Sequence, residues 1–204
     1  MGGSQFHTTR QRHHPHGRRC TSAHTLRRLP ARTSPSPPCS GAAGSNIIGC
    51  DLGFTELLRQ SEITRLPKLF CVQPLVCSPI ASAILAAQGR DDGKLVPAEW
   101  NVPMKTCAEG TSIACPLRLE ECVDAVLRSN GTAVRVSEPE IQRATKELAQ
   151  IGLYTEPTCA QAGAAYHELI GLGMIKAGEI TVIVLTSTGI KATPTIASFL
   201  GIEL

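Results

Sequence analysis

Two segments near the end of the chain carry side chains that could do chemistry. Residues 154–160 read YTEPTCA, an acidic-proline start to a helix, and residues 181–191 read TVIVLTSTGIK, an apolar strand that ends in hydroxyls. Open α/β sheets bind ligands at the carboxyl ends of their strands, so we expect these hydroxyls to face a ligand. A neutral hydroxyl from this cluster would suit a pyridine nitrogen that stays unprotonated. The alternative is that Thr186, Ser187 and Thr188 only cap the strand and its turn.

A loop of small residues that leads into a predicted helix is the second candidate. Its members are Gly41, Ala42, Ala43, Gly44, Ser45 and Asn46. Small side chains let backbone amides approach an anion, and the helix start adds N–H donors and a positive dipole end. The Ser45 hydroxyl and the Asn46 amide could add further donors. The loop fits neither the Walker A motif nor the dinucleotide fingerprint. It therefore indicates a phosphate site, with a plain helix start as the alternative.

The elements that must position these residues alternate regularly from Gly41 onward. The predicted strands are 68–73, 132–136 and 180–185, and the predicted helices are 47–60, 78–88, 115–129, 138–151, 158–174 and 195–200. Ser137 and Glu140 form a capping box at the start of one helix. Residues 89–114 are punctuated by Gly and Pro and predict a long loop. This alternation predicts an α/β fold with a small parallel sheet of three to four strands and covering helices.

The first 40 residues differ from the rest in charge and in pattern. They contain seven Arg and no Lys, Asp or Glu, which leaves 13 basic and 17 acidic residues in the body at 41–204. A segment with so little apolar periodicity cannot bury enough surface to offset its ordering entropy, so we expect a disordered basic tail. It could be an organelle transit peptide, a basic arm for phosphate backbones, or the product of a misplaced start or frame error. The third explanation is narrowly favoured.

Composition excludes several classes of protein. The nine cysteines contain no Cys-x-x-Cys pair, so we expect free thiols rather than a disulfide framework or a metal site. No apolar run approaches about 18 residues, which predicts no membrane span. The tail lacks aromatic residues beyond Phe6, so no specific nucleic-acid partner is expected. A cytoplasmic protein is expected, with organelle import if the tail is a transit peptide.

Six segments of the body resemble, in order, the C-terminal half of threonine synthase and related pyridoxal-phosphate (PLP) enzymes of fold type II. The matching segments are 44–49, 52–58, 68–74, 108–113, 154–160 and 185–191. The resemblance implies a partial large domain of that fold. It also implies PLP as cofactor, with its phosphate on Gly41, Ala43, Gly44, Ser45 and Asn46 and its pyridine nitrogen at Thr186. Cys159 stands where the family often has Ser, and we expect it to be a packing residue.

The implied reaction converts O-phosphohomoserine, a small amino-acid substrate, and water to threonine and phosphate. The family lysine that holds the cofactor belongs to its N-terminal half in a Ser-x-Lys-x-Arg context, which this chain lacks. The six lysines present are in polar or amphipathic settings: 68, 94, 105, 146, 176 and 191. We therefore expect an incomplete chain without catalytic competence, with its catalytic residues unknown. Apolar surface left by the absent half would favour a homo-oligomer or association with that half. The alternative is a noncatalytic α/β module that binds phosphate or a subunit and carries a basic targeting tail.

Overall fold

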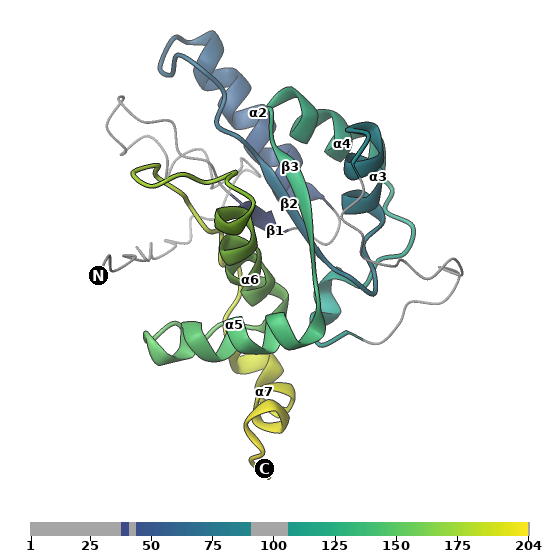
Figure 1. The fold of residues 1–204 in the computed structure, drawn as a ribbon, viewed down its shortest axis with the longest axis vertical. Helices are drawn as coiled ribbons and strands as arrows, with labels where there is room; N and C mark the ends of the chain where they lie inside the picture. Colours follow the sequence, from purple (N-terminus) through teal and green to yellow (C-terminus); the bar gives the residue numbers. More distant parts are fainter. Residues whose placement is uncertain (1–37, 41–43, 91–105, 204) are drawn as a thin grey trace, which may run out of the picture.

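Three parallel strands form the centre of the molecule. Figure 1 shows the computed structural model, which describes residues 38–40, 44–90 and 106–203. Strands β1 (Pro38–Ser40), β2 (Phe70–Pro74) and β3 (Thr132–Val136) pair in the order β1-β2-β3. The register places Phe70 opposite Thr132 and Pro74 opposite Val136. The predicted small parallel sheet is confirmed.

Helices separate the strands along the chain, as the alternation predicted. Their bounds are α2 (Ser45–Arg59), α3 (Pro79–Ala87), α4 (Leu119–Arg128), α5 (Glu138–Gln150), α6 (Pro157–Gly171) and α7 (Thr193–Leu200), with short 3-10 turns η1 (Glu109–Thr111) and η2 (Gly189–Ala192). The capping box at Ser137 and Glu140 is present at the start of α5. Helix α4 begins four residues later than predicted, and Pro116 disfavours helical geometry at Cys115, where the helix was predicted to begin. No helix in the described ranges is both long and apolar enough to cross a membrane.

The third strand is not the one that the sequence predicted. Residues 180–185 do not join the sheet, although their β-branched apolar pattern predicted a strand there. Val184 packs against one core cluster and Leu185 against the other. These partly buried residues form no strand of the described sheet, and Thr181 makes one bridge contact. A second isolated bridge joins Thr155 to Thr188 in antiparallel fashion.

Strand β1 supplies the missing pairing and corrects the predicted boundary of the tail. Pro38–Ser40 pairs in parallel with residues 70–72 of β2. These three residues had been assigned to the disordered tail at 1–40 because they lack a β-branched apolar pattern. The sheet therefore begins three residues before the predicted boundary. The rest of the tail, 1–37, lies outside the described residues.

Each face of the sheet carries its own hydrophobic cluster. Leu69 and Cys71 contribute to the cluster beneath α2, α3 and α4, whereas Phe70 and Val72 contribute to the cluster beneath α5 and α6. Successive side chains of a strand point to opposite faces, which explains this division along β2. In Figure 1 the two groups of helices cover opposite sides of the strands. All residues of β2 and β3 are buried, as expected for a parallel sheet covered on both faces.

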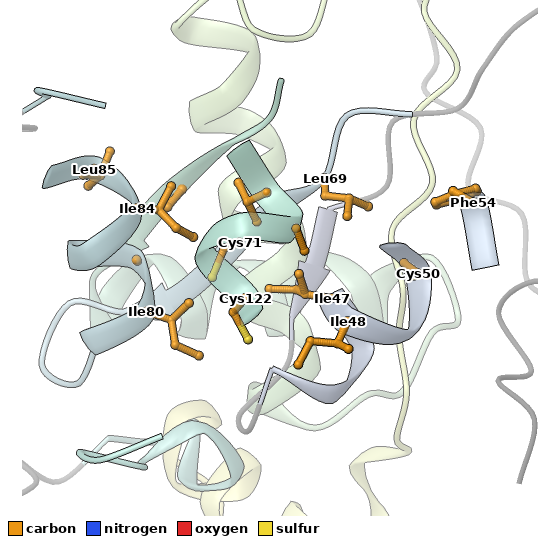
Figure 2. Packing of buried hydrophobic residues seen from close by; sticks show 14 of the residues in the cluster. Ile47, Ile48, Cys50, Phe54, Leu69, Cys71, Ile80, Ile84, Leu85 and Cys122 are labelled. Atoms are coloured by element: carbon orange, nitrogen blue, oxygen red, sulfur yellow. The ribbon is translucent and has the colours of Figure 1, made fainter. Parts of the chain in front are cut away.

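Figure 2 shows the first of these clusters, in which Cys71 and Cys122 lie among Ile47, Ile80 and Ile84. Cys122 is fully buried near the start of α4. Ile47 is fully buried in the first turn of α2. This cluster therefore lies directly beneath the start of α2, where the predicted phosphate loop ends.

Candidate cofactor site

Gly44 caps the N-terminus of α2 in a position that only glycine can occupy. Its φ of 75° is left-handed, and a Cβ at this residue would lie 1.9 Å from the Cys122 Sγ atom. The backbone and the neighbouring helix α4 thus both exclude a side chain. The Ile48 amide donates to the Gly44 carbonyl at 3.0 Å, which begins the helix. A helix start at which no side chain covers the backbone N–H groups is suited to binding an anion.

The first turn of α2 leaves its positive end without a carboxylate. It contains no acidic residue, and Gly44 provides no side-chain cap. Ser45 is exposed beside these amides, and Asn46 is half-buried. Backbone N–H groups at such a start need an acceptor from outside the helix. Of the predicted loop, the structure describes Gly44, Ser45 and Asn46, whereas Gly41 and Ala43 lie outside the described residues.

Thr186 lies against the first turn of α6 and not at the end of a strand. Its side chain is exposed, and its Oγ1 atom is 3.1 Å from the Cys159 Sγ atom. The Ser187 amide donates to the same sulfur at 3.2 Å. Cys159 is fully buried, so the expectation that it packs is correct but incomplete. Its sulfur also joins the two segments that the sequence had identified separately.

Three further hydrogen bonds hold residues 186–189 along residues 154–155. The Gly189 amide donates to the Tyr154 carbonyl at 3.0 Å, and the Thr188 hydroxyl donates to the same oxygen at 3.4 Å. The buried Thr155 hydroxyl donates to the Ser187 carbonyl at 3.0 Å. The bond between Gly189 and Tyr154 belongs to the antiparallel bridge between Thr155 and Thr188. These bonds fix the backbone around Thr186 even though the segment is outside the sheet.

The loop before α4 is anchored to the starts of α5 and α6. Glu138 accepts from the Thr106 hydroxyl at 2.6 Å and from the Cys107 amide at 2.8 Å. The Gly110 amide donates to the Thr158 hydroxyl at 3.2 Å, where a Cβ would approach Thr158 to 3.0 Å. Because α5 follows β3 directly, these helix starts lie at the carboxyl edge of the sheet. The start of α2, which follows β1, lies at the same edge.

No described lysine is placed to hold a cofactor in the interior. Lys146, Lys176 and Lys191 are exposed and Lys68 is half-buried, whereas the other two lie outside the described residues.

No cluster of metal-ligating side chains occurs in the described ranges. The free thiols Cys50, Cys71, Cys77, Cys107, Cys115, Cys122 and Cys159 agree with the expectation of unpaired cysteines.

The model of the pyridoxal-phosphate dependent enzyme family matches residues 38–187. The chain belongs to this family. The match begins at β1 and includes both Gly44 and Thr186. Pyridoxal phosphate is the cofactor of this family.

Among curated proteins, this family member is similar to threonine synthases. It is 30% identical over 157 residues to that of Methanosarcina acetivorans, covering 76% of this chain and 37% of that protein. It is 32% identical over 152 residues to that of Methanocaldococcus jannaschii, covering 74% of this chain and 36% of that protein. A chloroplastic threonine synthase of Arabidopsis thaliana is 28% identical over 148 residues, covering 72% of this chain and 28% of that protein. The chain thus spans between 28% and 37% of the length of these relatives.

Solved structures of the family share the fold. A fungal L-serine ammonia-lyase from Rhizomucor miehei superposes with a TM-score of 0.66 at 12% identity, over 90% of this chain and 55% of that chain. The processed threonine deaminase isoform 2 of Solanum lycopersicum superposes with a TM-score of 0.59 at 17% identity, over 90% of this chain and 49% of that chain. The predicted partial fold type II domain is confirmed.

The described residues are compatible with the family cofactor at the two predicted positions. The side of Gly44 that faces the core is closed to a Cβ by Cys122, and the α2 start has no acidic side chain to repel a phosphate. The exposed Thr186 hydroxyl is neutral, as a pyridine nitrogen requires in the sequence argument. Sequence reasoning missed Thr155 and the bonding role of Cys159. The motif YTEPTCA contained both residues, but nothing in it showed that they contact residues 186–187.

Proposed function

We propose that this chain is the cofactor-binding part of a threonine synthase-like PLP enzyme. The observation that carries the proposal is the glycine start of α2, closed to any side chain and free of acidic residues, within a family match that extends to Thr186. The alternative of a noncatalytic phosphate-binding or subunit-binding module is not favoured, because the family match covers residues 38–187 and not the loop alone.

In this proposal, one cofactor bridges the two motifs at the carboxyl edge of the sheet. The loop of Gly41, Ala43 and Gly44 and the first-turn amides of α2 bind the phosphate, with donors from Ser45 and Asn46. The Thr186 hydroxyl binds the ring nitrogen. Neither end supplies a general base, so the part played by these residues is to bind and orient the cofactor.

The bound cofactor supplies an electron sink for carbanion chemistry at an amino-acid substrate. By likeness to the threonine synthases, we propose O-phosphohomoserine as substrate and threonine and phosphate as products. The chain has no lysine in a Ser-x-Lys-x-Arg context. Turnover therefore requires a lysine-bearing segment that this chain does not supply, either from the remainder of the enzyme or from an associating subunit. The proposed compartment is the cytoplasm, with organelle import if the basic tail is an address.

A charge placed at the α2 start tests the phosphate end without disturbing the fold. Ser45→Asp adds a carboxylate to an exposed first turn, where it interacts favourably with the helix dipole by about 0.3–1 kcal/mol. The same carboxylate repels a phosphate. We expect PLP binding, followed by the fluorescence of the cofactor, to weaken at least tenfold in Ser45→Asp while thermal stability is kept or raised.

The neutral variant Ser45→Asn is the matched control, because it has the size of Asp without its charge. It should bind PLP within about twofold of the unsubstituted protein, since helix starts accept Asn well. Inorganic phosphate should compete with PLP in both neutral proteins. Equal binding by the Asp and Asn variants would exclude the α2 start as the phosphate site, and no binding by the unsubstituted protein would reject the function.

A further inference from the structure

We propose that Cys159 is a positioning residue whose thiol sets the direction of the Thr186 hydroxyl, so that Thr186 presents a hydrogen-bond donor to the ligand. This inference rests on the proposed function for the identity of the ligand. It concerns a residue that the sequence assigned only to packing. It also specifies the protonation state of the ligand's ring nitrogen that the site recognises.

Three groups surround the Cys159 sulfur, which is completely buried. The Ser187 amide lies at 3.2 Å, the Thr186 hydroxyl at 3.1 Å and a Glu156 carboxylate oxygen at 3.8 Å. The amide can only donate, so it occupies an acceptor position of the sulfur. The thiol has a single proton to donate to one of the two oxygens.

The thiol can donate to the Glu156 carboxylate at 3.8 Å, and in its 3.1 Å contact with Thr186 either group can donate. The proton is assigned to Thr186 because that contact is the shorter one. A thiol is a weak donor, and the Glu156 oxygen is 0.7 Å further from it than the Thr186 oxygen. The arrangement is also held from the other side, because Thr155 donates to the Ser187 carbonyl and keeps that peptide in place. The Ser187 amide therefore stays on the sulfur, and the thiol proton is directed at the Thr186 oxygen.

Once its oxygen accepts from Cys159, the Thr186 hydroxyl has its own proton to donate elsewhere. Within the described ranges, this exposed hydroxyl has no other hydrogen-bond partner. The geometry thus presents an outward O–H donor. Such a donor binds an unprotonated heteroaromatic nitrogen and disfavours a protonated one. A cofactor held in this way is a weaker electron acceptor than one whose ring nitrogen is protonated beside a carboxylate.

A pair of ligands that differ at one ring atom measures this donor directly. Pyridoxine 5′-phosphate has the ring nitrogen and no aldehyde, and its analogue carries CH in place of that nitrogen. The phosphate contacts are the same in both ligands, so their affinity ratio reports the nitrogen contact alone. We expect the unsubstituted protein to prefer the nitrogen ligand about fivefold, the effect of one neutral hydrogen bond.

In Cys159→Ala the Thr186 hydroxyl is free to rotate, and the preference should fall close to one. Cys159→Ser replaces the thiol with another single-proton donor and should restore the preference. Cys71→Ala is the matched control, because it removes a sulfur from an equally buried position on β2. It should leave the ratio unchanged even if it weakens both ligands.

The outcomes separate the two proposals. If neither ligand binds the unsubstituted protein, the proposed function fails. If both ligands bind and the ratio in Cys159→Ala equals that of the unsubstituted protein, the role of Cys159 fails and the function stands. A loss of affinity for both ligands by the same factor in Cys159→Ala, with the ratio kept, would show a structural role only and would overturn the inference.

A second measurement needs neither ligand nor a folded Ala variant. The S–H stretching band of Cys159 can be identified by subtracting the infrared spectrum of Cys159→Ser. Thr186→Val removes the acceptor at an exposed position, so the band should move to higher wavenumber. An unmoved band would mean that the thiol donates to Glu156, which overturns the proposal.

Discussion

The two ends of the candidate site each have a buried thiol, and the two thiols act in different ways. Cys122 lies under Gly44 and limits the space there, since a Cβ on Gly44 would come within 1.9 Å of its sulfur. Cys159 lies under residues 186–187 and binds them through its sulfur. The phosphate end is therefore shaped by exclusion of atoms, and the ring end by hydrogen bonds. Similar residues can thus serve a steric role or a bonding role, depending on the polarity of their neighbours.

The largest loss of stability should come from adding a side chain between Gly44 and Cys122. Gly44→Ala adds left-handed strain of about 1–2 kcal/mol and an overpacking cost of about 1–3 kcal/mol. We expect a loss of about 2–5 kcal/mol in the free energy of unfolding, measured with urea. The double variant Gly44→Ala/Cys122→Ala should recover the overpacking part, because the clashing sulfur is gone. Additive losses in the double variant would contradict the steric role of Cys122.

Replacing each of the two cysteines with serine should lower the free energy of unfolding by different amounts. Both losses should be smaller than the largest loss expected for Gly44→Ala. In Cys122→Ser a hydroxyl enters the apolar cluster of Figure 2, which should cost about 1–3 kcal/mol. In Cys159→Ser the new hydroxyl has Thr186 and the Ser187 amide as partners, so the loss should stay below about 1 kcal/mol. Thermal and urea unfolding of both variants would test this order. Equal losses would remove the distinction between the two ends.

The ring end should loosen when one supporting hydrogen bond is removed. Thr155→Val keeps the shape of a buried side chain but leaves the Ser187 carbonyl without its donor, at a cost of about 1 kcal/mol. Amide hydrogen exchange should speed up at Ser187 and Gly189, whereas exchange in α2 should be unchanged. Thr145→Val is a control, because its hydroxyl only donates to the Ile141 carbonyl within α5. Faster exchange at Ser187 in that control would refute the local role of Thr155.

The last expected effect is confined to alkaline pH. Burial raises the pKa of the Cys122 thiol from 9.0 to about 11. The unfolded chain therefore loses this proton before the folded protein does, so the contribution of Cys122 to stability is complete below pH 9 and declines as the pH rises toward 11. Cys122→Ala should show a shallower decline over that window in urea unfolding. Identical slopes would contradict the raised pKa.

Local chemistry allowed one part of the fold to be predicted to the residue. Strand Thr132–Val136 agrees with the structure at both ends. Asn130, at φ 55°, turns the chain before the strand, and the capping box at Ser137 starts the helix after it. Signals of this kind act within a few residues, so the sequence displays them directly.

The strand at 180–185 was predicted wrongly because its signal is not local. An apolar β-branched run shows that a segment is extended and partly buried. Whether it pairs depends on which segments lie beside it in the folded protein. Here β1 pairs with β2, although its sequence PCS has no apolar alternation. The pairing partner of an edge position cannot be found from the pattern of either segment alone.

The same contrast between local signals and long-range contacts applies to the candidate site. The small residues before α2 indicated a phosphate end, because the need for a bare backbone at a helix start can be recognised in a single stretch of sequence. The hydroxyls after residue 185 were also visible. Their attachment to Cys159 was not, because a side chain reveals its hydrogen-bond partners only when two distant segments are brought together.

The sequence by itself determined the α/β alternation, the helix start at Ser137, and the types of residue available at both ends of the site. Only the tertiary structure decided which strand completes the sheet, why Gly44 has no room for a side chain, and that Cys159 bonds to Thr186. The reason is physical. Backbone preference and capping depend on neighbours along the chain, whereas exclusion of atoms and sulfur hydrogen bonds depend on contacts within a few ångströms between residues separated by tens of positions.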